Sequence, residues 1–269
     1  MLSKLLKYEL KATGRIFVPL FLALLLFAAI TKVTSAISPE EWVTPTIISM
    51  IIYIIIMVGI FVMTLIMMIQ RFYQNLLSDE GYLMFTLPVK PWKHIISKLL
   101  VSIFWIIASG VVAMISIMII AFKRGDLNEI IRQFASIYNQ LFDVLGASFY
   151  LLSFEIAIII LIGLASGILI VYASMTIGHL FSQHKMLASL GGFIVLSTLS
   201  HILLTFITLI LGNTDFANTY TSIFLSNDLI SLLQAAQWAI AYTIFFEGLL
   251  CAAYFAVTNY ILSKRLNLE

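Results

Sequence analysis

Two carboxylates interrupt otherwise apolar stretches of this sequence: Glu155 lies in LLSFEIAIII and Glu247 in YTIFFEGLLC. A charge at bilayer depth costs about 2.5–3.5 kcal/mol, so each carboxylate should face a cavity or a partner, or be protonated. Together with His201, in LSHILLTF, they are candidates for a translocation path or a proton relay. The alternative is structural: neutral, hydrogen-bonded carboxyl groups and a histidine satisfied in the interior.

Motifs for other chemistry are missing. The sequence contains no G-x-x-x-x-G-K-[ST] phosphate loop, no H-E-x-x-H helix, no G-x-S-x-G elbow and a single cysteine, Cys251. The closest histidines, His179 and His184, are five residues apart, which points them to different faces of a helix. We therefore expect no enzyme activity, no metal site and no cofactor in this chain.

The composition is that of a membrane protein. Of 269 residues, 62% are hydrophobic and 10% are charged, whereas soluble domains have about 45–50% and 25%. The apolar residues come in long runs, so lipid is the expected solvent for most of the chain. The net charge is only +2 and the basic residues lie at segment ends, which leaves no basic face for nucleic acid.

Six stretches are long enough to cross a hydrocarbon core, which takes about 20 apolar residues per helix. The whole chain, 1–269, is predicted to be one all-α transmembrane domain with crossings near 16–36, 46–70, 99–122, 148–180, 186–212 and 237–262. The fourth would measure about 50 Å as one helix, so it should tilt, break or protrude. Within it, Gly163 and Gly167 have the spacing of a helix-packing seam, within one subunit or between two.

The basic residues predict the orientation of these crossings. With the N-terminus in the cytoplasm, eleven of the 15 Lys and Arg residues fall inside and four outside, as the positive-inside rule requires. The inner ones are Lys4, Lys7, Lys11, Arg15, Arg71, Lys90, Lys93, Lys98, Lys185, Lys264 and Arg265, and the outer ones are Lys32, Lys123, Arg124 and Arg132. Both termini are therefore expected in the cytoplasm.

Two amphipathic segments accompany the crossings. Residues 1–15, MLSKLLKYELKATGR, place leucines between lysines and predict a helix on the inner leaflet that leads at an elbow into the first crossing. The outer segment GDLNEIIRQFASIYNQLFDVLG has apolar residues at helical spacing and polar residues on the other face. We expect a helix that either rests on the outer membrane surface or caps the helix bundle.

The inner loop, 71–98, is the most charged interruption of the chain, yet its middle is apolar. Asp79 can cap a short helix with Glu80 in its first turn, and Leu87-Pro88 ends that helix. Such a helix of about two turns cannot bury all of its apolar residues against one surface; these are Tyr82, Leu83, Met84, Phe85 and Leu87. A patch of this kind indicates contact with the membrane interface or with another protein.

The stretch DEGYLMFTLPVKPWKHIISKLL resembles the loop between the second and third membrane helices of bacterial ABC-2 type permeases. In that family an acidic residue and a Gly precede a short apolar helix, a Thr-x-Pro and a Lys that opens the next crossing. The rest of the chain agrees in layout, with a basic N-terminal helix, six crossings and no nucleotide site. It differs from the larger members in having only a modest outer segment at 213–236.

The resemblance implies a permease subunit of an ATP-driven exporter in the bacterial cytoplasmic membrane. Two such subunits, identical or related, would enclose a path, and each would dock its short inner coupling helix on a separate ATPase subunit that binds ATP and Mg²⁺. The residues that would transmit the closure of the ATPase pair are Asp79, Glu80, Gly81, Tyr82, Leu83, Phe85, Thr86 and Pro88. Walls rich in Phe, Met, Ile and Leu favour a hydrophobic or amphipathic substrate such as a drug, lipid or peptide.

Two functions of other classes stay open. An ion- or proton-coupled carrier could use Glu155 and Glu247, although no inverted repeat of broken helices is apparent. A membrane scaffold or immunity protein without transport activity would use the inner loop only for docking.

Overall fold

The computed structural model describes residues 2–37, 43–78, 81, 89–121, 126–181, 183–212 and 229–264. Within these ranges the chain is helical and has no β-strand. Six helices are long and apolar enough to cross a membrane: Leu2–Ile37, Thr44–Leu77, Pro91–Ala121, Ser148–Gly178, Lys185–Leu209 and Ala235–Lys264. The structure thus confirms the predicted all-α chain with six helices able to span a bilayer.

The chain divides into two compact units, each of which is described by itself. The first unit comprises Met1–Phe72 and Pro88–Val144, and the second comprises Tyr73–Leu87 and Leu145–Glu269. The helices of the first unit are α1 (Leu2–Ile37), α2 (Val43–Phe72), α4 (Pro91–Ala121) and α5 (Asp126–Leu145), whose last residue belongs to the second unit. Those of the second unit are the π-helix η1 (Tyr73–Leu77), α6 (Ser148–Gly178), α7 (Lys185–Gly212) and α9 (Leu229–Lys264).

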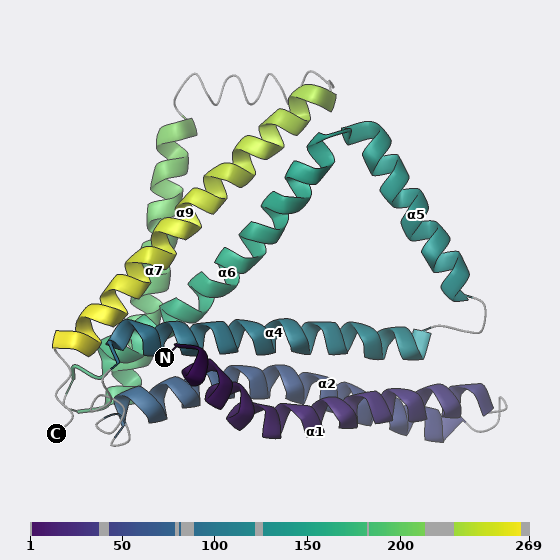
Figure 1. Ribbon diagram of the computed structural model, residues 1–269, viewed down its shortest axis with the longest axis horizontal. Coiled ribbons are helices and arrows are strands. Elements are labelled where there is room, and N and C mark those ends of the chain that lie inside the picture. Colours follow the sequence, from purple (N-terminus) through teal and green to yellow (C-terminus); the bar gives the residue numbers. More distant parts are fainter. Residues whose placement is uncertain are drawn as a thin grey trace. The chain divides into compact units, whose positions relative to one another are not determined.

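In the first unit, α1, α2 and α4 pack against one another, with α2 antiparallel to the other two (Figure 1). Their interior contains two apolar clusters. One is formed by Phe17, Met67, Val101 and Trp105, and the other by Leu24, Ala28, Tyr53 and Ile60. Most of the remaining apolar surface of these helices faces outward, as expected of helices whose solvent is lipid.

Helix α1 continues without interruption through the predicted boundary between the N-terminal elbow, 1–15, and the first crossing. Pro19 lies inside the helix and cannot donate a backbone hydrogen bond to the preceding turn, which is the usual cause of a kink. Figure 1 shows that α1 bends in its N-terminal half. Helix α1 is therefore continuous across the position at which the sequence predicted an elbow. The placement of residues 1–15 on the inner leaflet stays a prediction.

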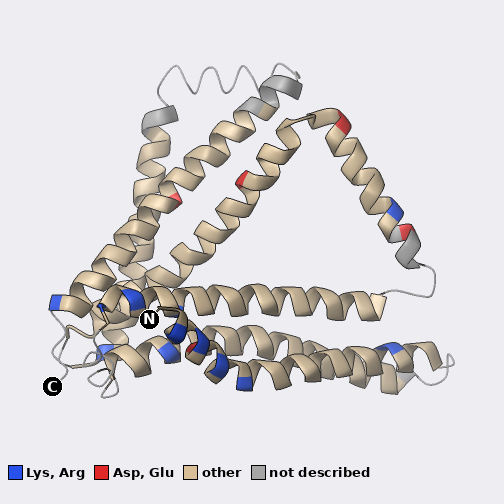
Figure 2. Ribbon diagram, in the orientation of Figure 1, with Lys and Arg blue, Asp and Glu red and all other residues tan. Residues whose placement is uncertain are grey.

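Basic residues gather at one end of the first unit, where α1 and α4 begin and α2 ends (Figure 2). Lys32 lies toward the other end of α1, where its Nζ donates to the Ile120 carbonyl at 3.0 Å. A cation at the last turn of α4 satisfies a terminal carbonyl and complements the helix dipole. The described part of the first unit therefore has a basic end. The orientation of this end toward the cytoplasm stays a prediction.

In the second unit, α6 packs on both α7 and α9. Figure 1 shows α7 running opposite to the other two, and the chain turns from α6 into α7 within a few residues. Helix α6 is unbroken over 31 residues, about 46 Å at 1.5 Å per residue. From its length, the fourth crossing was predicted to tilt, break or protrude from the membrane. Because α6 is unbroken, tilt or protrusion must accommodate its length.

Candidate functional site

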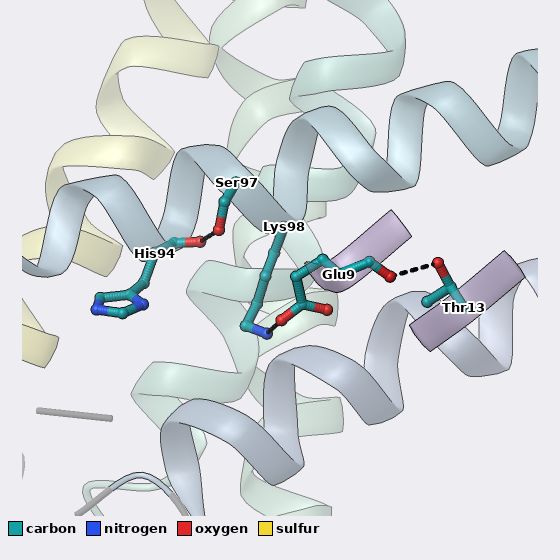
Figure 3. Close-up of polar contacts among 5 residues, drawn as sticks. All are labelled: Glu9, Thr13, His94, Ser97 and Lys98. Atoms are coloured by element: carbon teal, nitrogen blue, oxygen red, sulfur yellow. Dashed lines mark hydrogen bonds and ion pairs between the residues drawn. The ribbon is translucent and has the colours of Figure 1, made fainter. Parts of the chain in front are cut away.

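A buried ion pair joins α1 to α4 at the basic end of the first unit. Lys98 Nζ lies 2.7 Å from Glu9 Oε1, and the two side chains are 2% and 11% exposed, respectively. Figure 3 shows Glu9 reaching from α1 toward Lys98 on α4. Removing a charge from water is costly unless a partner compensates it, so each residue of this pair requires the other.

Further polar contacts extend from this pair along the interface between α1 and α4. Thr13, one turn after Glu9, donates its hydroxyl to the Glu9 carbonyl at 2.8 Å, and Trp105 Nε1 donates to Thr13 Oγ1 at 2.7 Å. The Trp105 ring stacks on Phe17 with centroids 4.4 Å apart. Glu9, Thr13 and Phe17 recur every four residues, which places them on one face of α1 against Lys98 and Trp105 of α4.

A cavity of about 20 Å³ lies among these side chains and is also lined by Thr64 and Arg71 of α2. This volume accommodates about one water molecule. It is far below the 300–1,000 Å³, roughly, of a small-molecule site. The cluster therefore serves as a polar junction of three helices rather than as a substrate pocket.

His94 lies on α4, one turn before Lys98, and is 1% exposed. The hydroxyl of Ser97 donates to the His94 carbonyl at 2.9 Å (Figure 3). Ile95 and Ser97 in the same turn are also buried. The interior of the first unit therefore reaches the first turns of α4. The end of the inner loop is thus built into the helix packing.

The beginning of the inner loop is also ordered by local contacts. Helix α2 is followed directly by the π-helix η1, whose Leu76 and Leu77 are buried. Gly81 donates its backbone N–H to the Ser78 carbonyl at 2.7 Å, and a Cβ at Gly81 would lie 2.8 Å from the Leu76 carbonyl oxygen. Only glycine permits this approach. Of the predicted coupling residues, Gly81 is described, whereas Asp79, Glu80, Tyr82, Leu83, Phe85, Thr86 and Pro88 lie outside the described residues.

Within the second unit, η1 contacts the end of α6. The rings of Tyr73 and His179 meet edge to face with centroids 6.1 Å apart. His179 follows the last residue of α6 and donates its backbone N–H to the Met175 carbonyl. Burial, together with the positive charge of Lys185, lowers the pKa of His179. A neutral imidazole is therefore favoured at this contact.

The predicted translocation-path residues occupy three helices of the second unit. Glu155 on α6 and Glu247 on α9 are half-buried, whereas His201 on α7 is exposed. Glu155 Oε2 is buried and has no hydrogen-bond partner among the described residues. Within that part of the chain, no group of three His, Cys, Asp or Glu residues could hold a metal ion. Among the described residues, Glu155 Oε2 is therefore an unsatisfied carboxylate oxygen. The translocation path through Glu155, Glu247 and His201 stays a prediction.

The close approach of α6 and α7 occurs at glycines other than the predicted Gly163 and Gly167. A Cβ at either of those positions would meet nothing within 4 Å. At Gly178, by contrast, a Cβ would overlap the backbone of Ser189, and at Gly192 it would lie 3.4 Å from the Ser174 carbonyl oxygen. The seam within this unit thus uses Gly178 and Gly192. A role of Gly163 and Gly167 between two subunits stays a prediction.

The ion pair of Glu9 with Lys98 was not predicted from the sequence, in which Lys98 counted only as a basic residue on the cytoplasmic side. One signal was present: Glu9 is the only acidic residue before Glu40 and lies among Lys4, Lys7 and Lys11. A single acid in a basic segment, on the face that carries leucines, indicates a buried partner. The identity of that partner required the structure.

Comparisons of this chain with models of known protein families, with curated proteins and with solved structures found no match.

Proposed function

We propose that this chain is the membrane-spanning permease subunit of an ATP-driven exporter of the ABC-2 type. It would pair with a second permease, identical or related, and depend on a separate ATPase subunit. The proposal is supported by the loop sequence DEGYLMFTLPVKPWKHIISKLL between two apolar helices and by six helices able to cross a membrane. The gathering of basic residues where α2 ends and α4 begins favours a cytoplasmic location for that loop.

One observation carries the proposal: both ends of the 71–98 loop are anchored by buried contacts. At its start, Leu76 and Leu77 are buried and Tyr73 contacts His179 at the end of α6. At its end, Lys98 is paired with Glu9 of α1. Close-packed elements move as bodies rather than deform, so a force on the middle of the loop would reach membrane helices at both ends.

The proposed cycle uses this anchoring. ATP-driven closure of two ATPase subunits would displace the coupling helix, whose side chains include Tyr82 and Phe85, and the permease pair would change from an inward to an outward opening. The N-terminal elbow would lie on the inner leaflet, because Lys4, Lys7 and Lys11 are exposed on α1 while Glu9 faces the interior. Apolar walls favour a hydrophobic or amphipathic substrate: a drug, a lipid or a peptide.

Co-purification tests the proposal. Replacing Tyr82 and Phe85 together with Ala should abolish co-purification of an ATPase subunit from native membranes, while the permease still inserts. The matched control replaces Tyr150 and Phe154, two exposed aromatic residues of α6, with Ala. If the Tyr82 and Phe85 variant retains its ATPase as well as the control does, the coupling assignment is wrong.

A second function is favoured by Glu155 Oε2, which is buried and has no hydrogen-bond partner among the described residues. An unsatisfied carboxylate oxygen within an apolar helix is typical of a group that exchanges a proton, as in a proton-coupled carrier. Export of an amphipathic dye from membrane vesicles separates the two functions, because a carrier requires a pH gradient and an ABC exporter requires ATP. Loss of gradient-driven export in Glu155→Gln and Glu247→Gln would favour the carrier.

A further inference from the structure

Two of the buried polar atoms in the second unit have no hydrogen-bond partner among the described residues and belong to the neighbouring helices α6 and α9. They are Glu155 Oε2 on α6 and the Tyr242 hydroxyl on α9. Buried polar groups in folded proteins are almost always hydrogen-bonded, so each exception requires an explanation. One explanation is a ligand whose polar group comes from outside the chain.

Glu155 lies on the buried face of α6. At 100° per residue, three buried residues project within about 40° of it: Ser166, Leu169 and Ala173. The contact with α7 uses a different face, because Ser174 and Gly178 project about 100° and 140° away from Glu155. Helix α9 also packs on α6, so we infer that the face of Glu155 is the one that α9 covers.

Tyr242 lies at the edge of the face that α9 turns toward α6. The buried residues Ala235 and Phe246 project within about 40° of it, and α9 packs mainly on α6. The Tyr242 ring stacks on Phe246 with centroids 6.4 Å apart. Because α6 and α9 run in the same direction (Figure 1), the N-terminal halves that contain Glu155 and Tyr242 lie side by side.

The described part of the second unit supplies no cation for this carboxylate. Its basic residues are Lys185, which begins α7, and Lys264, which ends α9. Both lie toward the end of the unit at which α6 ends, away from Glu155. A carboxylate in an apolar helix pairs with a cation or is protonated, and within this unit the cation would have to come from another molecule.

We propose that Glu155 and Tyr242 bind an alkylammonium group at the interface of α6 and α9. The carboxylate pairs with the ammonium charge, and the Tyr242 hydroxyl oxygen accepts one of its N–H bonds. The stacked rings of Tyr242 and Phe246 add the attraction of an aromatic face for a cation. Only the ammonium group needs to enter the interface, since an apolar remainder can stay among the lipid chains.

This inference deepens the proposed function, on which it rests for the transport of the bound molecule. It narrows the substrate class from hydrophobic or amphipathic molecules to cationic amphiphiles. The two unsatisfied atoms weaken the ligand-free protein and gain hydrogen bonds when the ammonium group binds. Binding is measured on the purified permease without an ATPase, so a failure of this inference leaves the assignment as a permease untouched.

Cross-linking tests whether the two residues share a site. In a Cys251→Ala background, Glu155→Cys is combined with Tyr242→Cys, and a short bifunctional methanethiosulfonate is added to the purified protein. The control pair combines Glu155→Cys with Tyr260→Cys, about five turns further along α9. The mass of the intact protein should show one bridging reagent in the first pair and none in the control pair. A failure to bridge the first pair would overturn the shared site.

Binding of a fluorescent amine tests the ligand class. Dansylcadaverine carries a primary ammonium group on an apolar fluorophore, and its N-acetyl derivative is the same molecule without the charge. We expect saturable enhancement of dansyl emission by the amine and at least about tenfold weaker binding of the acetylated form. Glu155→Gln should weaken binding of the amine by about tenfold or more, and Tyr242→Phe by about two- to tenfold. Tyr260→Phe, at an exposed tyrosine of the same helix, is the matched control and should bind as the wild type does.

Two outcomes of the binding measurement overturn the proposal. Equal binding of the amine and its acetylated form means that the site recognises the apolar fluorophore alone. Wild-type affinity in Glu155→Gln means that the carboxylate is a neutral packing group. The melting temperatures of the ligand-free Glu155→Gln and Tyr242→Phe proteins should equal or exceed that of the wild type, because each variant removes an unsatisfied buried group. A loss of binding in these variants therefore reports on the site and not on the fold.

Discussion

The two units use their side-chain hydroxyl groups differently. In the first unit, hydroxyl groups that bond their own helix also connect helices: the Tyr53 hydroxyl of α2 lies 2.8 Å from Ser116 Oγ of α4, and Thr64 Oγ1 lies 3.2 Å from Ser109 Oγ. In the second unit, the hydroxyl of Thr176 bonds a backbone carbonyl of its own helix three residues earlier, and that of Thr258 one four residues earlier. Their helices instead approach closely at glycines.

This difference indicates how each unit is held in a lipid solvent. Apolar burial contributes little to helix association in a bilayer, where lipid is as apolar as the interior, so hydrogen bonds and close packing specify the contacts. Cross-helix bonds with fixed partners resist sliding of α1, α2 and α4. Packing at Gly178 depends on shape alone. We expect single substitutions of polar residues to weaken the first unit, and an added methyl group to weaken the second.

The largest expected effect is at the ion pair. Lys98→Met leaves the Glu9 carboxylate buried without its charge partner, which should destabilise the protein by about 3–5 kcal/mol. The measurement is the melting temperature of the purified protein in detergent. Lys11→Met, an exposed lysine of α1, is the control and should change stability by less than about 0.5 kcal/mol.

The double variant Glu9→Gln and Lys98→Met sharpens this test, since it removes both charges. It should be more stable than Lys98→Met alone, because no isolated charge remains in the interior. Equal melting temperatures for the single and double variants would contradict the view that the first unit depends on the pairing.

Much of this architecture could be predicted from the sequence. The six crossings follow from run length, and the outer helix over 125–146 follows from the spacing of its apolar residues; the structure places α5 at Asp126–Leu145. Both features are local, because a run or a period is contained within one segment. The sequence predicted an elbow between residues 1–15 and the first crossing, whereas α1 is one continuous helix. A proline such as Pro19 can bend a helix without ending it.

The long-range contacts could not be predicted in the same way. Glu9 and Lys98 are 89 residues apart, and nothing in either segment specifies the other. The spacing of Gly163 and Gly167 satisfied a packing motif, yet α6 turns Gly178 toward α7, because the seam lies near the tight turn that joins the two helices. Which face of a helix meets a neighbour depends on tertiary packing, which a local motif does not contain.

The second prediction concerns this seam. Gly178→Ala places a Cβ against the backbone of Ser189, so α6 and α7 must move apart. Overpacking of this kind costs about 1–3 kcal/mol. The melting temperature in detergent should fall accordingly, whereas in Gly163→Ala, where nothing lies within 4 Å of the new Cβ, it should stay the same or rise. Similar losses in both variants would show that the seam does not specify the contact.

The third prediction compares two tyrosines. Tyr53→Phe removes a hydroxyl that bonds Ser116 across helices, at an expected cost of about 0.5–1.5 kcal/mol. Tyr242→Phe removes a buried hydroxyl of α9 that has no hydrogen-bond partner among the described residues, so stability should be unchanged or increased. Thermal unfolding of the two variants beside the wild type measures the difference. A greater loss at Tyr242 would mean that its hydroxyl bonds a water, a lipid or another subunit.

The smallest effect is expected from acidification at His179. Its pKa is lowered in the folded protein by burial and by Lys185, so the unfolded chain binds a proton more readily. The stabilising contribution is fully present above the ordinary histidine pKa of 6.5 and is lost as the pH falls through the lower folded pKa. The melting temperature of His179→Asn should therefore decrease less between neutral and acidic pH than that of the wild type. His201→Asn is the control and should retain the wild-type decrease, since it leaves His179 intact. If the melting temperature of His179→Asn decreases as much as that of the wild type, protonation of His179 at its contact with Tyr73 does not cause the loss of stability in acid.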